Sequence, residues 1–130
     1  MSTHSIELRV RYAETDQMGV VYYANYLVWF EIARTEFFRV KGIEYRKIEE
    51  EENVYIPVVE AYCRYRAPLR YDDLIVVTAG LTDVGAMRVT FDYEVTIGGK
   101  LAATGTTKHA FVNKEGIPIP IPAKIKKAFT

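Results

Sequence analysis

The sequence is poor in cysteine and histidine, and each shortage narrows what the protein can be. Its 130 residues include one cysteine, Cys63, and two histidines, His4 and His109. A single cysteine excludes an intrachain disulfide and fits a reducing compartment, so we expect a cytoplasmic protein with Cys63 as a small core side chain. The two histidines lie far apart in the sequence, so we expect no metal site, and His109 is predicted to be a core or interface residue.

Net charge and long apolar runs are absent as well. Seventeen basic side chains balance seventeen acidic ones, which gives no electrostatic reason to expect nucleic acid or an anionic membrane as a partner. No window approaches the roughly eighteen uninterrupted apolar residues of a membrane-spanning helix. The first ten residues also lack the apolar core of a signal peptide. We therefore expect one domain over residues 1–130, without membrane insertion.

The first half of the chain changes its hydrophobic period once. Residues 5–12 alternate, which predicts a half-buried strand whose inward side chains include Val10 and Tyr12. From Asn25 the apolar side chains, Leu27 among them, recur at three- and four-residue steps, which predicts a largely buried helix of about sixteen residues. Asn25 is the predicted N-cap of this helix, and Gly42 its C-terminal stop.

The remainder of the chain is predicted to be mostly strands. A short helical or irregular stretch over residues 45–53 comes first, and a short helix from Ala123 ends the chain. Gly98 and Gly99 form a predicted hairpin turn. Four strands are expected to form a meander against which the long helix packs, an α+β arrangement. They are predicted over residues 55–67, 74–82, 88–97 and 100–112.

The loop between the first strand and the long helix contains an acid with no basic neighbour, Asp16. The N–H groups at a helix N-terminus, here near Tyr23, carry partial positive charge and can donate to an oxyanion on a substrate carbonyl. Gly19 would let the backbone approach a ligand. Two interpretations stay open: Asp16 caps nearby amides in an Asx-type turn, or it is a nucleophile or base. Apolar side chains that would suit an acyl group surround it: Val20, Val21, Tyr22 and Tyr23.

Several motifs in this region match a known family. They are "YAETD" at residues 12–16, "MGVVY" at 18–22, "ANY" at 24–26, "FEIART" at 30–35 and "YRAPLRYDD" at 65–73. Together they resemble the 4-hydroxybenzoyl-CoA thioesterase family of the hot-dog fold, and most of all its Tol–Pal-associated acyl-CoA thioesterases. The resemblance implies a hot-dog fold, in which a five-stranded antiparallel sheet wraps around a long central helix.

The resemblance also implies an activity and its residues. The chain would be an acyl-CoA thioesterase, with Asp16 as nucleophile or general base and the Tyr23 backbone amide polarising the carbonyl. Some relatives carry histidine at the Tyr23 position, so no role of that histidine is assumed here. No cofactor is implied, because coenzyme A is part of the substrate. The predicted substrate-binding residues are Gly19, Val20, Val21, Tyr22, Asn25 and Arg88.

Charged residues and an exposed strand edge predict how phosphates are bound and how subunits assemble. The coenzyme A phosphates need cations, and the candidates are Arg88, Arg64, Arg66, Arg70 and Lys108. The tyrosine- and valine-rich edge over residues 55–65 invites a second subunit, so we expect a dimer or a dimer of dimers with an interfacial site. Two other functions stay open: a non-catalytic acyl-CoA or lipid binding module, and a hot-dog hydratase or dehydratase.

Overall fold

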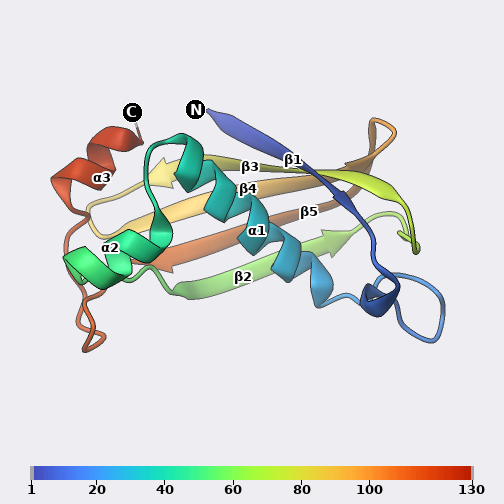
Figure 1. Ribbon diagram of the computed structural model, residues 1–130, viewed down its shortest axis with the longest axis horizontal. Helices are drawn as coiled ribbons and strands as arrows, with labels where there is room; N and C mark the ends of the chain where they lie inside the picture. The colour runs from blue at the N-terminus through green and yellow to red at the C-terminus, as the bar shows by residue number, and fades with distance from the viewer. Residues whose placement is uncertain (1, 130) are drawn as a thin grey trace.

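The computed structural model describes residues 2–129, which form a twisted antiparallel sheet with one long helix across a face of it (Figure 1). This is the α+β arrangement that the sequence predicts. The elements are β1 (Thr3–Arg9), a 3-10 turn (Tyr12–Glu14), α1 (Asn25–Val40), α2 (Tyr45–Glu52), β2 (Val58–Tyr65), β3 (Leu74–Val84), β4 (Arg88–Ile97), β5 (Lys100–Ala110) and α3 (Ala123–Ala128).

The five strands lie in the order β1-β3-β4-β5-β2, and all neighbouring pairs are antiparallel. The predicted meander is correct for β3, β4 and β5, whose β4–β5 turn has Gly98 and Gly99 at φ of 55° and 77°. It is wrong for β2, because β2 pairs with β5 rather than with β3. After β2 the chain crosses to β3, between β1 and β4, so β2 forms an edge of the sheet (Figure 1).

Helix α1 lies close to the sheet because small side chains on β5 make room for its aromatic ones. A Cβ atom at Gly105 would overlap the ring of Phe30, which stacks on Tyr93 with ring centroids 4.3 Å apart. The helix is sixteen residues long, as predicted. Its buried apolar side chains are Tyr26, Trp29, Phe30, Ala33, Phe37 and Phe38, whereas Leu27 is 40% exposed and its prediction was wrong.

Two predictions at the ends of elements were also wrong. Strand β1 stops at Arg9, and the chain then leaves the sheet in a 3-10 turn, so Tyr12 is exposed and packs edge-on against Tyr71. Asn25 is not the N-cap of α1: Ala24 holds that position, and the Asn25 side chain donates to the carbonyl of Glu14 instead. The predicted stop is correct, since the residue after the C-cap, Gly42, has φ of 81°.

The two scarce residue types lie in different environments. His109 is fully buried on β5, as a core residue. Cys63 was expected in the core but is only partly buried, because it belongs to the edge strand β2. Burial still raises the pKa of its thiol. Among residues 2–129, no helix is both long enough and apolar enough to cross a membrane.

Candidate active site

The loop that carries Asp16 is a tight turn fixed by its own backbone. The Asp16 N–H donates to the carbonyl of Val20, and the Gly19 N–H donates to the carbonyl of Asp16, both at 2.9 Å. Gly19 has φ of 79°, which L-residues with a side chain rarely adopt. Asp16 Oδ1 also accepts from the Met18 N–H at 2.9 Å, so the Asx-type turn is present. Its second carboxylate oxygen, Oδ2, accepts no hydrogen bond from residues 2–129.

The same loop forms one wall of a cavity of about 390 Å³. The opposite wall is the connection between β2 and β3, to which the loop is tied by a 2.8 Å bond from the Val21 N–H to the Leu69 carbonyl. Most of the lining is apolar or aromatic, which suits an acyl group. The lining residues are Asp16, Val20, Val21, Tyr23, Tyr26, Tyr65, Arg66, Ala67 and Pro68.

The start of α1 supplies the cavity with an unused backbone donor. The Tyr23 N–H donates to no acceptor within residues 2–129, and neither does the N–H of the next residue, Ala24, whereas the N–H groups of Tyr22 and Asn25 are bonded. The Tyr65 hydroxyl, from the edge strand β2, donates to the Tyr23 carbonyl at 3.0 Å. Tyr26 packs edge-on against Tyr65, and burial raises the pKa of the Tyr26 hydroxyl to about 12. An acid and a free amide therefore border one largely apolar space.

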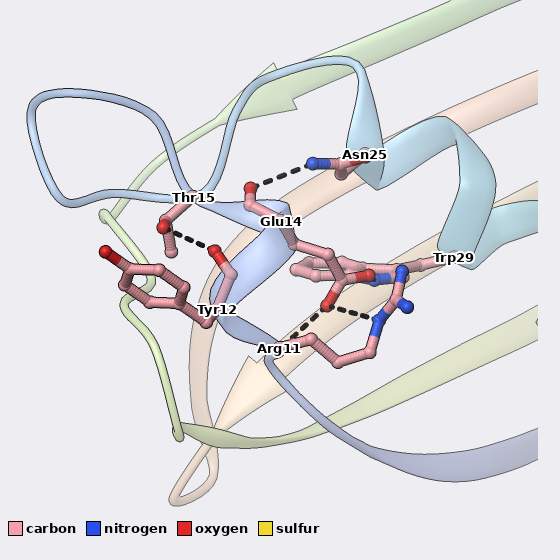
Figure 2. Close-up of polar contacts among 6 residues, drawn as sticks. All are labelled: Arg11, Tyr12, Glu14, Thr15, Asn25 and Trp29. Carbon is pink, nitrogen blue, oxygen red and sulfur yellow. Dashed lines mark hydrogen bonds and ion pairs between the residues drawn. The ribbon is translucent and has the colours of Figure 1, made fainter.

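A second acid, Glu14, holds this loop against the helix (Figure 2). Its carboxylate accepts from the indole N–H of Trp29 at 2.9 Å and from the backbone N–H of Arg11 at 2.8 Å. The Arg11 side chain adds an ion pair at 3.6 Å. The Glu14 carbonyl accepts from the Tyr22 N–H at 2.9 Å and from the Asn25 side chain at 2.8 Å. One buried residue thus joins the 3-10 turn after β1, the loop and α1.

The structure brings some of the predicted site residues together and separates others. Four line the cavity, namely Asp16, Val20, Val21 and Tyr23, and Gly19 forms the adjacent turn. The other three lie outside the lining. Tyr22 is 45% exposed and its ring lies 4.7 Å from that of Tyr23, Asn25 bonds Glu14, and Arg88 begins β4 at the opposite end of the sheet from β1's Arg9.

Arg66 is the one cavity-lining member of the candidate phosphate-binding set. Within residues 2–129, no group of three or more His, Cys, Asp or Glu side chains is placed to hold a metal ion. A larger cavity, of about 700 Å³, lies where α1, α2 and the start of β2 meet, and it contains none of the predicted site residues. We place the candidate site at the smaller cavity because only that one joins Asp16 to Tyr23.

Sequence reasoning overlooked two residues that shape this site, Glu14 and Tyr65. A signal for Glu14 did exist. A tryptophan on the buried face of a helix needs an acceptor for its indole N–H, and Glu14 lies in the same motif as Asp16. The contact between Tyr65 and Tyr23 had no comparable signal, because it depends on where β2 joins the sheet.

Comparison with known proteins places this fold and cavity in a family. Residues 10–129 match the model of the Thioesterase-like superfamily. The chain belongs to this superfamily. It is 39% identical over 124 residues to the putative acyl-CoA thioesterase YneP of Bacillus subtilis, covering 95% of this chain and 87% of that protein. It is 31% identical over 126 residues to the acyl-CoA thioesterase YbgC of Haemophilus influenzae, covering 96% and 93%.

A solved member of the superfamily agrees with the structure as well. Slr0204, a 1,4-dihydroxy-2-naphthoyl-CoA thioesterase from Synechocystis, gives a TM-score of 0.91 at 26% identity, over 98% of this chain and 96% of that one. The hot-dog fold expected from the motifs is therefore confirmed. The expectation of a thioesterase is confirmed at the level of the superfamily and its named relatives.

Proposed function

We propose that this member of the thioesterase-like superfamily hydrolyses acyl-CoA thioesters to a free acid and coenzyme A. The observation that supports it is the cavity of about 390 Å³ that is bordered by both Asp16 and Tyr23. Asp16 has a carboxylate oxygen without a hydrogen bond from residues 2–129, and Tyr23 has an N–H without an acceptor there. These are the two groups that attack on a carbonyl requires, a nucleophile or base and an oxyanion donor. Membership of the narrower Tol–Pal-associated group is part of this proposal and rests on the motifs.

In the proposed reaction the thioester carbonyl oxygen accepts a hydrogen bond from the Tyr23 N–H. Either the Asp16 carboxylate attacks the carbonyl carbon, expels the coenzyme A thiolate and leaves a mixed anhydride that water cleaves, or Asp16 takes a proton from a water that attacks directly. Both routes consume one water and give the same acid and thiol. Apart from this water and the substrate, every group used comes from the chain, so we propose that no dissociable cofactor takes part.

We assign the other parts of the substrate to the remaining lining. Val20, Val21 and Tyr26 would enclose the acyl group and exclude water from the thioester. Among the basic candidates, Arg66 rather than Arg88 would hold a coenzyme A phosphate, because Arg66 alone of the five lines the cavity. An arginine binds phosphate oxygens through several N–H donors at once.

We propose a homodimer or a dimer of dimers for the assembled protein. Strand β2 is an edge strand and is exposed along nearly its whole length. Its exposed apolar and aromatic residues include Val58, Val59 and Tyr62, and its last residue, Tyr65, lines the cavity. Pairing with a second copy would cover this edge and place the cavity beside an interface. A monomer in sedimentation velocity at assay concentration would contradict this arrangement.

The activity is tested by thiol release from a panel of short aliphatic, long aliphatic and aromatic acyl-CoAs. We expect turnover by the wild type on at least one of them, and a fall of about 10²- to 10⁴-fold in Asp16→Asn, the range typical of a lost general base. Asparagine retains Oδ1 for the Met18 N–H, so the turn should survive. Equal rates in the two proteins would contradict the role of Asp16. Tight coenzyme A binding without any turnover would instead indicate a binding module.

A further inference from the structure

The acid that precedes the candidate catalytic residue by two positions is bonded in a different way. Glu14 is 6% exposed and does not line the cavity, so it lies beyond reach of a substrate there. Its two carboxylate oxygens take different partners: Oε2 accepts from the Trp29 indole, and Oε1 accepts from the Arg11 backbone. A buried carboxylate is costly unless donors compensate it. Here one donor, Trp29, belongs to α1, and the other, Arg11, is the N-cap of the 3-10 turn that contains Glu14. The side chain therefore ties the 3-10 turn that follows β1 to α1.

The backbone of Glu14 extends the same connection to the site. Its carbonyl accepts from the N–H of Tyr22, the residue directly before Tyr23. It also accepts from the side chain of Asn25 in the first turn of α1, the contact that Figure 2 shows. On the other side, only Thr15 separates Glu14 from Asp16. Glu14 thus forms a hydrogen bond with the residue before Tyr23 and lies two positions before Asp16 in the sequence. Moving Glu14 would change the position of Asp16 relative to the Tyr23 N–H.

We propose that Glu14 is a positioning residue, which sets the separation between the Asp16 carboxylate and the Tyr23 amide by anchoring the loop to Trp29. The inference rests on the proposed function, because those are its two reacting groups. A carboxylate suits this position since both of its oxygens face donors. A glutamine would turn an N–H₂ group toward one of those donors, so one of the two hydrogen bonds would be lost and the anchor weakened while the bulk stays the same.

The proposal predicts a specific kinetic pattern for Glu14→Gln. Misplacing the reacting groups by about 1 Å costs on the order of 10²-fold, so we expect kcat to fall by roughly ten- to hundredfold while KM changes less than about twofold. Trp29→Phe removes only the indole donor and should cause a smaller fall of the same kind. Because Glu14 acts through Asp16, Glu14→Gln should lower the rate of Asp16→Asn by no more than about twofold.

A matched control separates positioning from a general loss of stability. Thr107→Val removes two buried hydrogen bonds, to Tyr93 and His109, without touching the loop, and it should lower Tm while kcat stays within about twofold of the wild type. Trp29 is the only tryptophan, so the protein gives a single indole N–H signal by NMR. In Glu14→Gln we expect this signal to shift and the amides of residues 16–23 to exchange faster, with neither change in Thr107→Val.

The outcomes distinguish this inference from the proposed function. A wild type that hydrolyses no thioester would overturn the function, and the indole signal and loop exchange would still decide whether Glu14 holds the loop. An active wild type with unchanged kcat in Glu14→Gln would overturn the inference alone. So would a kcat loss of equal size in the Asp16→Asn background, or a loss that simply follows Tm as in Thr107→Val.

Discussion

Two clusters of polar groups lie at different places along helix α1, and they differ in whether their hydrogen-bonding capacity is used. Near the middle of α1, the buried Arg34 guanidinium donates to the Tyr93 hydroxyl at 3.0 Å. Further hydrogen bonds join Tyr93 to Thr107 at 2.6 Å and Thr107 to His109 at 2.8 Å. Within residues 2–129, no buried side-chain nitrogen or oxygen lacks a partner. At the N-terminus of α1, by contrast, Asp16 Oδ2 and the Tyr23 N–H form no hydrogen bond with the described residues, and both residues line a cavity.

The donor and acceptor roles in the buried hydrogen-bond cluster can be assigned starting from the Ile56 carbonyl. The Ile56 carbonyl can only accept, so His109 Nδ1 carries the proton and donates to it at 3.3 Å. His109 Nε2 must then accept from Thr107, which in turn accepts from Tyr93. Every group has a fixed role, so this cluster stabilises one packing of α1 on the sheet. Asp16 Oδ2 and the Tyr23 N–H have no such fixed partner within residues 2–129, as the proposed reaction requires.

Lowering the pH should destabilise the buried cluster, and this is the largest stability effect that we predict. Burial, and then the nearby Arg34 charge, lower the pKa of His109 to about 4 from its ordinary 6.5. Between these two pKa values, His109 is therefore protonated in the unfolded chain and neutral in the folded one. The resulting penalty is absent well above pH 6.5, grows as pH falls, and reaches on the order of 3 kcal/mol below pH 4.

About 2 kcal/mol of this penalty should develop between pH 7 and pH 5. Urea unfolding across that range measures it, and His109→Gln is the control that removes the titrating group while keeping hydrogen-bonding atoms. The difference in unfolding free energy between wild type and His109→Gln should shrink as pH falls. Parallel stability curves for the two proteins would show that the suppressed ionisation of His109 contributes nothing.

A substitution inside the buried cluster should affect stability and leave the chemistry alone. Thr107→Val keeps the shape but leaves the Tyr93 hydroxyl without its acceptor and His109 Nε2 without its donor. We expect a loss of about 2 kcal/mol in unfolding free energy, the typical cost of unsatisfied buried polar groups. Urea denaturation and thiol release measure the two halves of the prediction. A rate that falls more than about tenfold at full folding would mean that the two clusters are coupled.

The fold could be predicted from the sequence where it depends on neighbouring residues, and not where it depends on tertiary packing. Periodicity predicted the long helix, the β4–β5 hairpin and the stop at Gly42, because each depends on neighbours in the chain. It could not place β2, since the partner of an edge strand is decided by tertiary packing. Tyr12 was misplaced for a related reason: alternation continues in the sequence past Arg9, where the chain has already left the sheet.

The site was predictable in part, and the limit is again tertiary. The motifs pointed to Asp16 and Tyr23, and the structure puts both beside one cavity. Asn25 was misread because an asparagine near a helix start is usually a cap, whereas here the Glu14 carbonyl takes its side chain. Arg88 was predicted to bind substrate, and in the folded chain it begins β4, far along the sheet from the loop.

The smallest predicted effect concerns Arg66, the cation that lines the cavity, which should affect substrate binding and not the chemical step. Arg66→Gln removes the cation that lines the cavity, and we expect KM for acyl-CoA to rise about tenfold with kcat unchanged, because the phosphate contact is the same in substrate and transition state. The matched control is Arg64→Gln, which removes the same charge from a β2 residue outside the lining and should leave KM within about twofold. Steady-state kinetics at low and high salt checks the cause: the ratio of the Arg66→Gln to the wild-type KM should shrink as salt screens the contact. Equal KM values for the two arginine variants would remove Arg66 from the phosphate site and leave the cavity at the start of α1 without its proposed cation.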